Sequence, residues 1–264
     1  MRLGLITGSF SDTLSGLEDA TARVAQTRFG EVELTDGMLA GARVVHVSRH
    51  GEGHARLSSH VNHRANITAL AQSEVDAVLA VSVCGALDPT LELGTLIVFD
   101  DLHFLSNRLP DGSLCTLYGQ PGADGRGHWI FAQPFSQPLR AALLEGARDS
   151  SLAVLDGGCY GHVDGPRFNS RAEIRTLHSA GVTAISQTAG PETVLAGEAQ
   201  LPYALLGNVT DYANGVTPQP NAMEELMRLL EASTAAFASA LAAAASRLVE
   251  RGAPPPTGTV VRVG

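Results

Sequence analysis

The chain contains no lysine, because all 18 basic residues among its 264 are arginine. A mechanism built on a lysine Schiff base is therefore excluded. The arginines are spread thinly and the formal net charge is −9, so no basic face is available to attract nucleic acid or anionic lipid. The composition favours a small-molecule ligand, with neither nucleic acid nor a membrane as a partner.

Cysteine is also scarce, and long apolar runs are missing. Cys84, Cys115 and Cys159 are widely spaced and show no CxxC pattern, which predicts neither a disulfide framework nor a zinc site. No stretch reaches the roughly 18 uninterrupted apolar residues of a membrane span. Residues 1–6 resemble a strand of the fold rather than a secretion signal. We expect a soluble protein of the reducing cytoplasm.

Short apolar runs rich in valine, isoleucine and leucine are typical of buried strands. They lie at 2–7, 42–48, 77–83, 95–99, 152–155, 182–186 and 203–209. Helical spacing occurs between them, at about 60–73, 137–148, 170–180, 191–199 and 220–250. This alternation predicts one α/β domain over residues 1–250, with a mixed or largely parallel central sheet flanked by helices.

Two segments stand apart in composition. Residues 106–128 are dense in glycine, proline, aspartate and serine, and they predict a long surface loop that is functional or mobile. Residues 251–264 contain Pro254-Pro255-Pro256 and predict a flexible C-terminal tail.

Polar residues follow the apolar runs where each predicted strand ends. Because ligands of open α/β sheets bind beyond the carboxyl ends of strands, these residues are the candidate site. Hydroxyls, an arginine and backbone N–H groups near glycine suit a phosphate or another oxyanion. The ends carry Thr7-Gly8-Ser9, Ser48-Arg49-His50-Gly51, Ser82-Val83-Cys84-Gly85, Ser186-Gln187-Thr188 and Thr210-Asp211.

Each of these residues also has a plainer interpretation. Arg49 and His50 fit a solvated surface turn, and Ser9 and Ser82 fit turns in which a serine bonds its own backbone. Asp211 fits a helix N-cap or turn. Cys84 fits a small apolar core residue better than a nucleophile. Neither a P-loop nor a dinucleotide-binding glycine motif is present.

Longer motifs in the same order resemble the 5′-methylthioadenosine phosphorylase branch of the trimeric purine nucleoside phosphorylases. They are Ser48-Arg49-His50-Gly51-Glu52-Gly53-His54, Val61-Asn62-His63-Arg64-Ala65-Asn66, Asp164-Gly165-Pro166-Arg167-Phe168, Gln187-Thr188-Ala189-Gly190-Pro191-Glu192 and Thr210-Asp211-Tyr212. The resemblance implies a single-domain three-layer fold. It also implies that inorganic phosphate, as co-substrate and without another cofactor or a metal, cleaves a purine nucleoside to base and pentose 1-phosphate.

The resemblance assigns roles to individual residues. Asp211 and His50 would be catalytic, with Asp211 acting on N7 and the 6-position of the base as a protonated carboxyl of raised pKa. His128 would enter the 5′-substituent pocket of a neighbouring subunit in a homotrimer, and as a solvated loop histidine it has an equally plain interpretation. Glu192 is expected to help start a helix. The implied phosphate ligands are Ser9, Arg49, His50, Ser82, Val83 through its backbone, and Thr188; the implied base and ribose contacts are Phe168, Asn169, Gln187, Asp211, Ala213 and Asn214.

The sequence departs from the family pattern where the nucleoside would bind. Phe10 replaces a glycine of the first phosphate loop, and Gln187 replaces a methionine beside the ribose. Ala213 replaces a second base-reading aspartate, and Asn169 stands where a small hydroxyl residue is usual. These changes leave base preference open.

Alternatives to cleavage of 5′-methylthioadenosine or a related nucleoside therefore remain. They are a phosphorylase for 6-oxopurine nucleosides such as inosine or methylthioinosine, a hydrolytic nucleosidase on the same fold, and a non-catalytic nucleoside-binding protein.

Overall fold

The computed structural model describes residues 1–8, 14–219 and 222–263. Within these residues, eleven strands form one mixed sheet and two more form a small antiparallel sheet. The strands are β1 (Arg2–Thr7), β2 (Glu18–Thr27), β3 (Gly30–Leu39), β4 (Ala42–Ser48), β5 (Ala77–Ala86), β6 (Leu96–Val98), β7 (Asp101–His103), β8 (Gly127–Ile130), β9 (Val154–Asp156), β10 (Cys159–His162), β11 (Val182–Ser186), β12 (Tyr203–Tyr212) and β13 (Thr259–Arg262).

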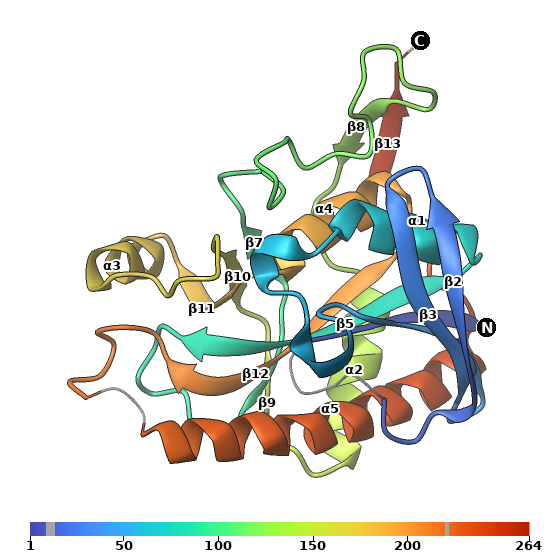
Figure 1. The fold of residues 1–264 in the computed structure, drawn as a ribbon. Helices are drawn as coiled ribbons and strands as arrows, with labels where there is room; N and C mark the ends of the chain where they lie inside the picture. Colours follow the sequence, from blue (N-terminus) through green and yellow to red (C-terminus); the bar gives the residue numbers. More distant parts are fainter. Residues whose placement is uncertain (9–13, 220–221, 264) are drawn as a thin grey trace.

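Helices cover both faces of the large sheet (Figure 1). In the view of Figure 1, α1 (His63–Gln72) and α4 (Ala189–Glu198) lie above the sheet, and α2 (Gln137–Asp149) and α5 (Met223–Arg251) lie below it. Helix α3 (Arg171–Ser179) stands at one end, and short 3-10 turns occur at Glu52–His54 and Ser58–His60. The predicted α/β fold with a central mixed sheet is confirmed.

Strand alternation divides the core into two clusters, one on each face. Successive side chains of a strand point to opposite faces. Ile6, Val45 and Val78 accordingly pack with residues of α1 and α4. Their chain neighbours Leu5, Val44 and Leu79 pack with residues of α2 and α5. The three predicted layers follow from strands that are apolar on both sides.

One edge of β5 pairs first with β1 and then with β11, and the two partners diverge between them. We call this divergence the fork of β5, and it determines where the site lies. Along one edge β5 pairs in parallel with β1 through Ala77–Ala80, and then with antiparallel β11 only at Gly85 and Ala86. Among the described strands, none pairs with residues 81–84 on that edge. The other edge of β5 pairs with β12 throughout. A gap therefore opens inside the sheet beside residues 81–84.

The β2–β3 hairpin is absent from the sequence-based prediction. The two strands pair antiparallel at the edge of the sheet, and most β2 side chains are exposed. Because an edge strand of this kind contains no apolar run, a search for buried strands misses it. The alternation of Val32-Glu33-Leu34-Thr35 was the signal available in the sequence.

The two segments of unusual composition are fastened to the body. In the long loop, Arg64 of α1 donates to the carbonyls of Leu114 and Thr116, and the Glu198 carboxylate of α4 accepts from the Leu117 N–H. The expectation of a flexible tail is wrong for residues 259–262, which form β13 against β8. These residues are held in place because the pairing with β8 buries Val260.

Helix α5 is long and apolar enough to cross a bilayer by length and composition alone. Its buried residues, among them Phe237, Leu241 and Leu248, instead pack against the sheet and α2. Such packing is what a core helix of a globular domain shows.

One prediction concerns His46 of β4, which is 3% exposed beside the Thr7 hydroxyl. Burial lowers its pKa from 6.5 to about 4. The unfolded chain therefore binds a proton that the folded chain excludes, so stability is full above about pH 6.5 and falls as pH decreases toward 4. The expected loss in the free energy of unfolding is about 2 kcal/mol at pH 5.

Urea unfolding at neutral pH and near pH 5, for the wild type and His46→Gln, measures this loss. The variant should show the smaller pH dependence, because its amide does not titrate. Equal pH dependence in the two proteins would assign the effect to other groups.

Candidate active site

A cavity of about 500 Å³ opens at the fork of β5. Its walls are the carboxyl ends of β4, β5, β11 and β12, the segment after β10 and the first turns of α5. Strands β1, β4, β5 and β12 run parallel, so their ends meet on one side of the sheet. Strand β11 runs antiparallel to β5, and this direction brings its last residues back to the fork.

Most of the sequence-predicted site residues line this one cavity. They are Arg49, His50, Ser82, Val83, Phe168, Asn169, Gln187, Thr188, Asp211, Ala213 and Asn214. Ser9 and Phe10 lie outside the described residues. His128 lies on the exposed strand β8, away from the cavity lining of its own chain. Its predicted place in a partner's pocket stays a prediction.

Arg49 is buried at the bottom of the fork and is only 2% exposed. Its Nη1 donates to the Val81 carbonyl at 3.2 Å, and its Nε and Nη2 donate to the two oxygens of Glu192 at 2.5 and 2.9 Å. Gly8 allows this approach, since a Cβ at residue 8 would lie 2.7 Å from Nη1. The interpretation of Arg49 as a solvated turn residue is excluded.

Glu192 is the main residue that sequence reasoning undervalued. It lies in the first turn of α4, as expected, but its side chain points inward and is 0% exposed. Burial raises the pKa of this carboxyl, yet the Arg49 guanidinium dominates and holds the pKa well below its ordinary value. A glutamate after Gly190-Pro191 in an otherwise apolar helix was the available signal.

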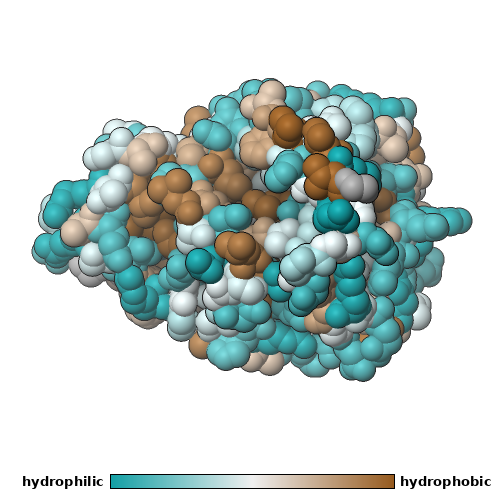
Figure 2. Space-filling view, turned by 90° about the horizontal axis from the view of Figure 1, so that it is seen from above, coloured by the Kyte–Doolittle hydropathy of each residue, from teal (hydrophilic) through white to brown (hydrophobic). Residues whose placement is uncertain are grey.

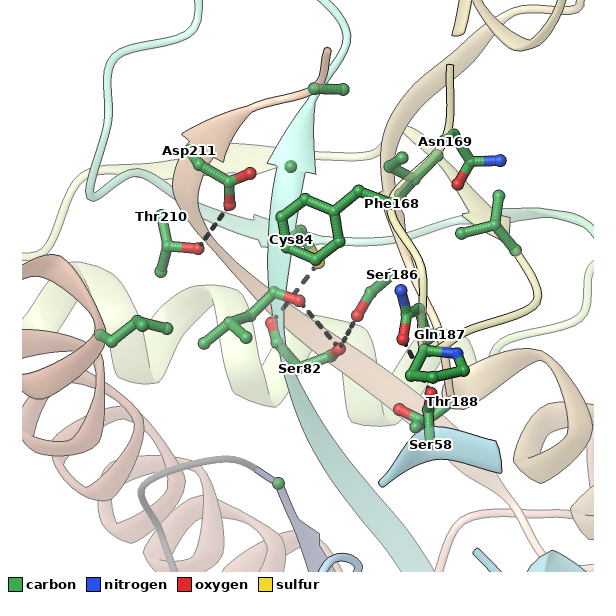
Figure 3. Close-up of a pocket in the computed structure, with 18 of the residues that line it drawn as sticks. Ser58, Ser82, Cys84, Phe168, Asn169, Ser186, Gln187, Thr188, Thr210 and Asp211 are labelled. Carbon is green, nitrogen blue, oxygen red and sulfur yellow. Dashed lines mark hydrogen bonds between the residues drawn. The ribbon is translucent and has the colours of Figure 1, made fainter. Parts of the chain in front are cut away.

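The exposed edge of β5 supplies backbone groups to the fork. Because the Val81 carbonyl points to Arg49, the backbone groups of Val83, two residues on, point to the same edge. Between them, the Ser82 hydroxyl donates to Ser186 Oγ at 3.0 Å (Figure 3). Backbone and hydroxyl groups thus surround the cavity end where Arg49 lies.

Thr188 stands at the N-terminus of α4 and is 4% exposed. The buried Tyr160 hydroxyl accepts from the N–H groups of Thr188 and Ala189 at 3.4 and 3.1 Å. The Thr188 side chain caps no backbone N–H of its own helix. Thr188 lines the cavity at the positive end of the helix dipole.

His50 is held by its ring nitrogen Nδ1, which lies 2.8 Å from the Arg56 carbonyl. A carbonyl only accepts, so Nδ1 carries the proton. Burial and the neighbouring Arg49 charge lower the pKa of His50 to about 4, and the ring is neutral near pH 7. His54 stacks on it at 4.2 Å between ring centres. Nε2 of His50 is therefore a hydrogen-bond acceptor.

Asp211 is the second-last residue of β12 and pairs with Gly85, four residues along β5 from Val81, which Arg49 contacts. Burial raises the pKa of its carboxyl, although the Thr210 hydroxyl donates to Oδ1 at 2.9 Å and acts in the other direction. Oδ2 lies over Gly85, where an added Cβ would come within 3.3 Å. The raised pKa agrees with the property that a proton donor at this position requires.

Phe168, Asn169 and Asn214 line the part of the cavity near Asp211. In Figure 3 the Phe168 ring lies between Asp211 and the Ser186–Gln187 segment. The ring is 69% exposed, so Phe168 is not a core aromatic residue. Asn214 Nδ2 donates to the Asn169 carbonyl at 2.8 Å and ties the two loops together.

Gln187 is held on both ends of its amide. Its Oε1 accepts from the Ser58 hydroxyl at 2.7 Å (Figure 3). Its Nε2 donates to the Arg167 carbonyl at 3.2 Å. This position therefore presents a fixed polar wall in place of the flexible apolar side chain of the family pattern.

Cys84 lines the same cavity but is 2% exposed. Burial raises the pKa of its thiol to about 12. A thiol protonated at neutral pH packs as an apolar group.

Further lining residues were not assigned from the sequence. Ser58 and His54 come from the turns after β4, and Ser186 precedes the predicted Gln187. Helix α5 contributes an apolar part of the wall that only the tertiary structure identifies: Met223, Leu226 and Leu230.

The fold and the site define an α/β enzyme-like domain that holds a small molecule at the carboxyl ends of its strands. Residues 2–250 match the family model described as the Phosphorylase superfamily, and the chain belongs to this family. The match covers the whole of the predicted domain, and the family predicted from the motifs is confirmed.

Named relatives agree with this assignment. The chain is 37% identical over 215 residues to a probable S-methyl-5′-thioinosine phosphorylase of Xylella fastidiosa, covering 81% of this chain and 89% of that protein. It is 32% identical over 234 residues to a probable 6-oxopurine nucleoside phosphorylase of Thermococcus kodakarensis, covering 87% and 86%.

Solved structures show the same fold. Methylthioadenosine phosphorylase from Schistosoma mansoni in complex with adenine superposes with a TM-score of 0.86 and 26% identity. The superposition covers 96% of this chain and 92% of that one.

Proposed function

We propose that the protein is a pentosyltransferase that cleaves a purine nucleoside by phosphorolysis, giving the free base and a pentose 1-phosphate. The observation that carries this proposal is the arrangement of one cavity. A buried, fixed arginine with hydroxyls lies at one end, and a carboxyl of raised pKa lies at the other. Family membership supports the same chemistry.

Inorganic phosphate is the proposed co-substrate and binds at the fork. Arg49 supplies the positive charge, while Ser82, Thr188 and the backbone of Val83 supply hydrogen bonds. Held there, a phosphate oxygen attacks C1′ of the pentose as the bond from C1′ to N9 of the base breaks. Fixing the nucleophile beneath the sugar removes the entropic cost of bringing the two reactants together.

The base leaves with the bonding electron pair and becomes more basic at N7. A protonated Asp211 donates a hydrogen bond or a proton there, which neutralises the developing charge. Phe168 covers the face of the purine. His50, neutral and fixed by Arg56, accepts a hydrogen bond through Nε2 from a hydroxyl of the pentose or of the phosphate.

The proposed substrate is 5′-methylthioadenosine or a related 5′-modified nucleoside. Met223, Leu226 and Leu230 give the cavity an apolar wall, which suits an alkylthio group better than a free 5′-hydroxyl. Relatives named S-methyl-5′-thioadenosine phosphorylase, such as that of Geobacter sulfurreducens at 34% identity, favour the same class.

A 6-oxopurine nucleoside, such as methylthioinosine, is the second candidate. Ala213 leaves Asp211 without a second carboxylate to accept from a 6-amino group, and a protonated Asp211 is itself a donor. The names of the Xylella and Thermococcus relatives refer to substrates of this class.

A homotrimer is the proposed assembly. The face in Figure 2 carries brown apolar side chains within a mostly hydrophilic surface. Exposed apolar residues gather in the segments around β7, β8 and β13, namely Leu105, Leu114, Ile130, Phe131 and Val261. His128 stands in the same surface, as its proposed role in a partner's pocket requires.

Light scattering should give three times the chain mass.

Base release from 5′-methylthioadenosine, methylthioinosine, adenosine and inosine, with and without inorganic phosphate, tests the proposed reaction. We expect release only with phosphate, and fastest from a 5′-methylthio nucleoside. Release without phosphate would indicate a nucleosidase, and binding without release would indicate a non-catalytic protein.

Thr188→Val tests the phosphate end of the cavity. The change keeps the shape of the side chain and removes one hydrogen bond to an anion, so the KM for phosphate should rise about tenfold to a hundredfold. The KM for the nucleoside should change little. Steady-state kinetics with each substrate varied in turn measures both, and equal effects on the two KM values would contradict the assignment.

Asp211→Asn tests the base end. With an adenine nucleoside, kcat/KM should fall about a hundredfold or more, because an amide does not transfer a proton. In the wild type the protonated form acts, so activity dependent on Asp211 is retained at low pH and lost as pH rises through its raised pKa. The variant should lack this decrease. An unchanged rate with every base would exclude the role.

A further inference from the structure

We infer that Glu192 is a positioning residue of the phosphate site, which acts by fixing the guanidinium of Arg49. The inference rests on the proposed function. It gives a role in the reaction to a residue that contacts neither substrate. The evidence is the set of contacts around the buried ion pair of Arg49 and Glu192.

The first contact set concerns the arginine. A guanidinium has five N–H groups in a fixed plane. Nε and Nη2 donate to the two oxygens of Glu192, and Nη1 donates to the Val81 carbonyl. Among the described residues, one N–H on each terminal nitrogen has no acceptor, and Arg49 lines the cavity. Glu192 therefore leaves a fork of two donors for an oxyanion.

The second contact set fixes the glutamate itself. The Tyr203 hydroxyl of β12 donates to Oε2 at 3.0 Å, and both side chains are fully buried. His63 of α1 faces Oε1 at 3.6 Å from Nδ1. The carboxylate is therefore held by Arg49 and Tyr203 in a place from which solvent is excluded. A binding group held this way loses little entropy when the anion arrives.

The charge of Glu192 allows two possible roles to be distinguished: holding the guanidinium in position, and changing the electrostatic attraction of phosphate. Glu192 cancels the charge of Arg49, so replacing it with a neutral residue makes the site more positive. Long-range attraction alone would then strengthen phosphate binding. Loss of positioning would weaken it, because the guanidinium loses its two-point hold. The two effects have opposite signs.

The experiment compares Glu192→Gln, Tyr203→Phe and Glu198→Gln. Glutamine keeps the size of the side chain but sets an NH2 group against the guanidinium N–H. Tyr203→Phe keeps the charge pair and removes one bond to the carboxylate. Glu198 is the matched control, since it lies on the same helix and bonds Thr116 and Leu117 rather than Arg49.

We expect Glu192→Gln to raise the KM for inorganic phosphate about tenfold or more, with the KM for the nucleoside changed less than about twofold. Tyr203→Phe should raise the phosphate KM about two- to threefold, and Glu198→Gln should leave it unchanged. A role in stability alone would lower the melting temperature without this difference between the two KM values.

A second readout is the shift of the melting temperature caused by added inorganic phosphate, which needs no turnover. The shift should be large in the wild type and Glu198→Gln and small in Glu192→Gln. A folded Glu192→Gln with an unchanged or lowered phosphate KM would overturn the inference. If Glu192→Gln does not fold, an unchanged phosphate KM and shift in Tyr203→Phe would overturn it.

The two readouts also separate this inference from the proposed function. A wild type that is stabilised by phosphate but releases no base would refute the reaction, while the phosphate shift still tests Glu192. A wild type that neither binds nor uses phosphate would refute both.

Discussion

The site depends on one interruption of pairing along β5. Strand β1 ends its pairing at Ala80 and β11 begins at Gly85, so residues 81–84 have no described strand on one edge, and Ser82, Val83 and Cys84 line the cavity. Buried backbone groups need partners. Arg49 donates to the Val81 carbonyl, the Ser82 hydroxyl lies 3.2 Å from the Val83 carbonyl, and Val83 lines the cavity. The same gap admits Ser186 from β11, which explains why residues from distant motifs meet there.

The charges of the site follow from burial. An arginine and a glutamate that are both removed from water require each other, since either one alone would be an uncompensated buried charge. The pair fixes where the guanidinium lies. At the other end, burial raises the pKa of the Asp211 carboxyl, and the Thr210 hydroxyl opposes this shift in part. One cavity thus combines a permanent positive group with a carboxyl of raised pKa.

Sequence patterns predicted the strands that are apolar on both faces, such as β1, β4 and β11, with the bounds that the structure shows. They missed the β2–β3 hairpin and the strand β13 in the tail. Strands β2 and β13 are mostly exposed and depend on their pairing partners, and β3 alternates between buried and exposed residues without a continuous apolar run. The composition of the long loop before β8 predicts a functional or mobile segment, and in the structure Arg64 and Glu198 fasten it through contacts distant in sequence.

The sequence by itself determined the fold class and which residues end the strands, because local periodicity and motif order are written along the chain. Only the tertiary structure decided that Glu192 faces Arg49, 143 positions away in the sequence, rather than solvent at a helix start. It also decided that α5 completes the cavity with Met223, Leu226 and Leu230. The direction of a helical side chain and the partner of a buried charge depend on how layers pack, which no local pattern specifies.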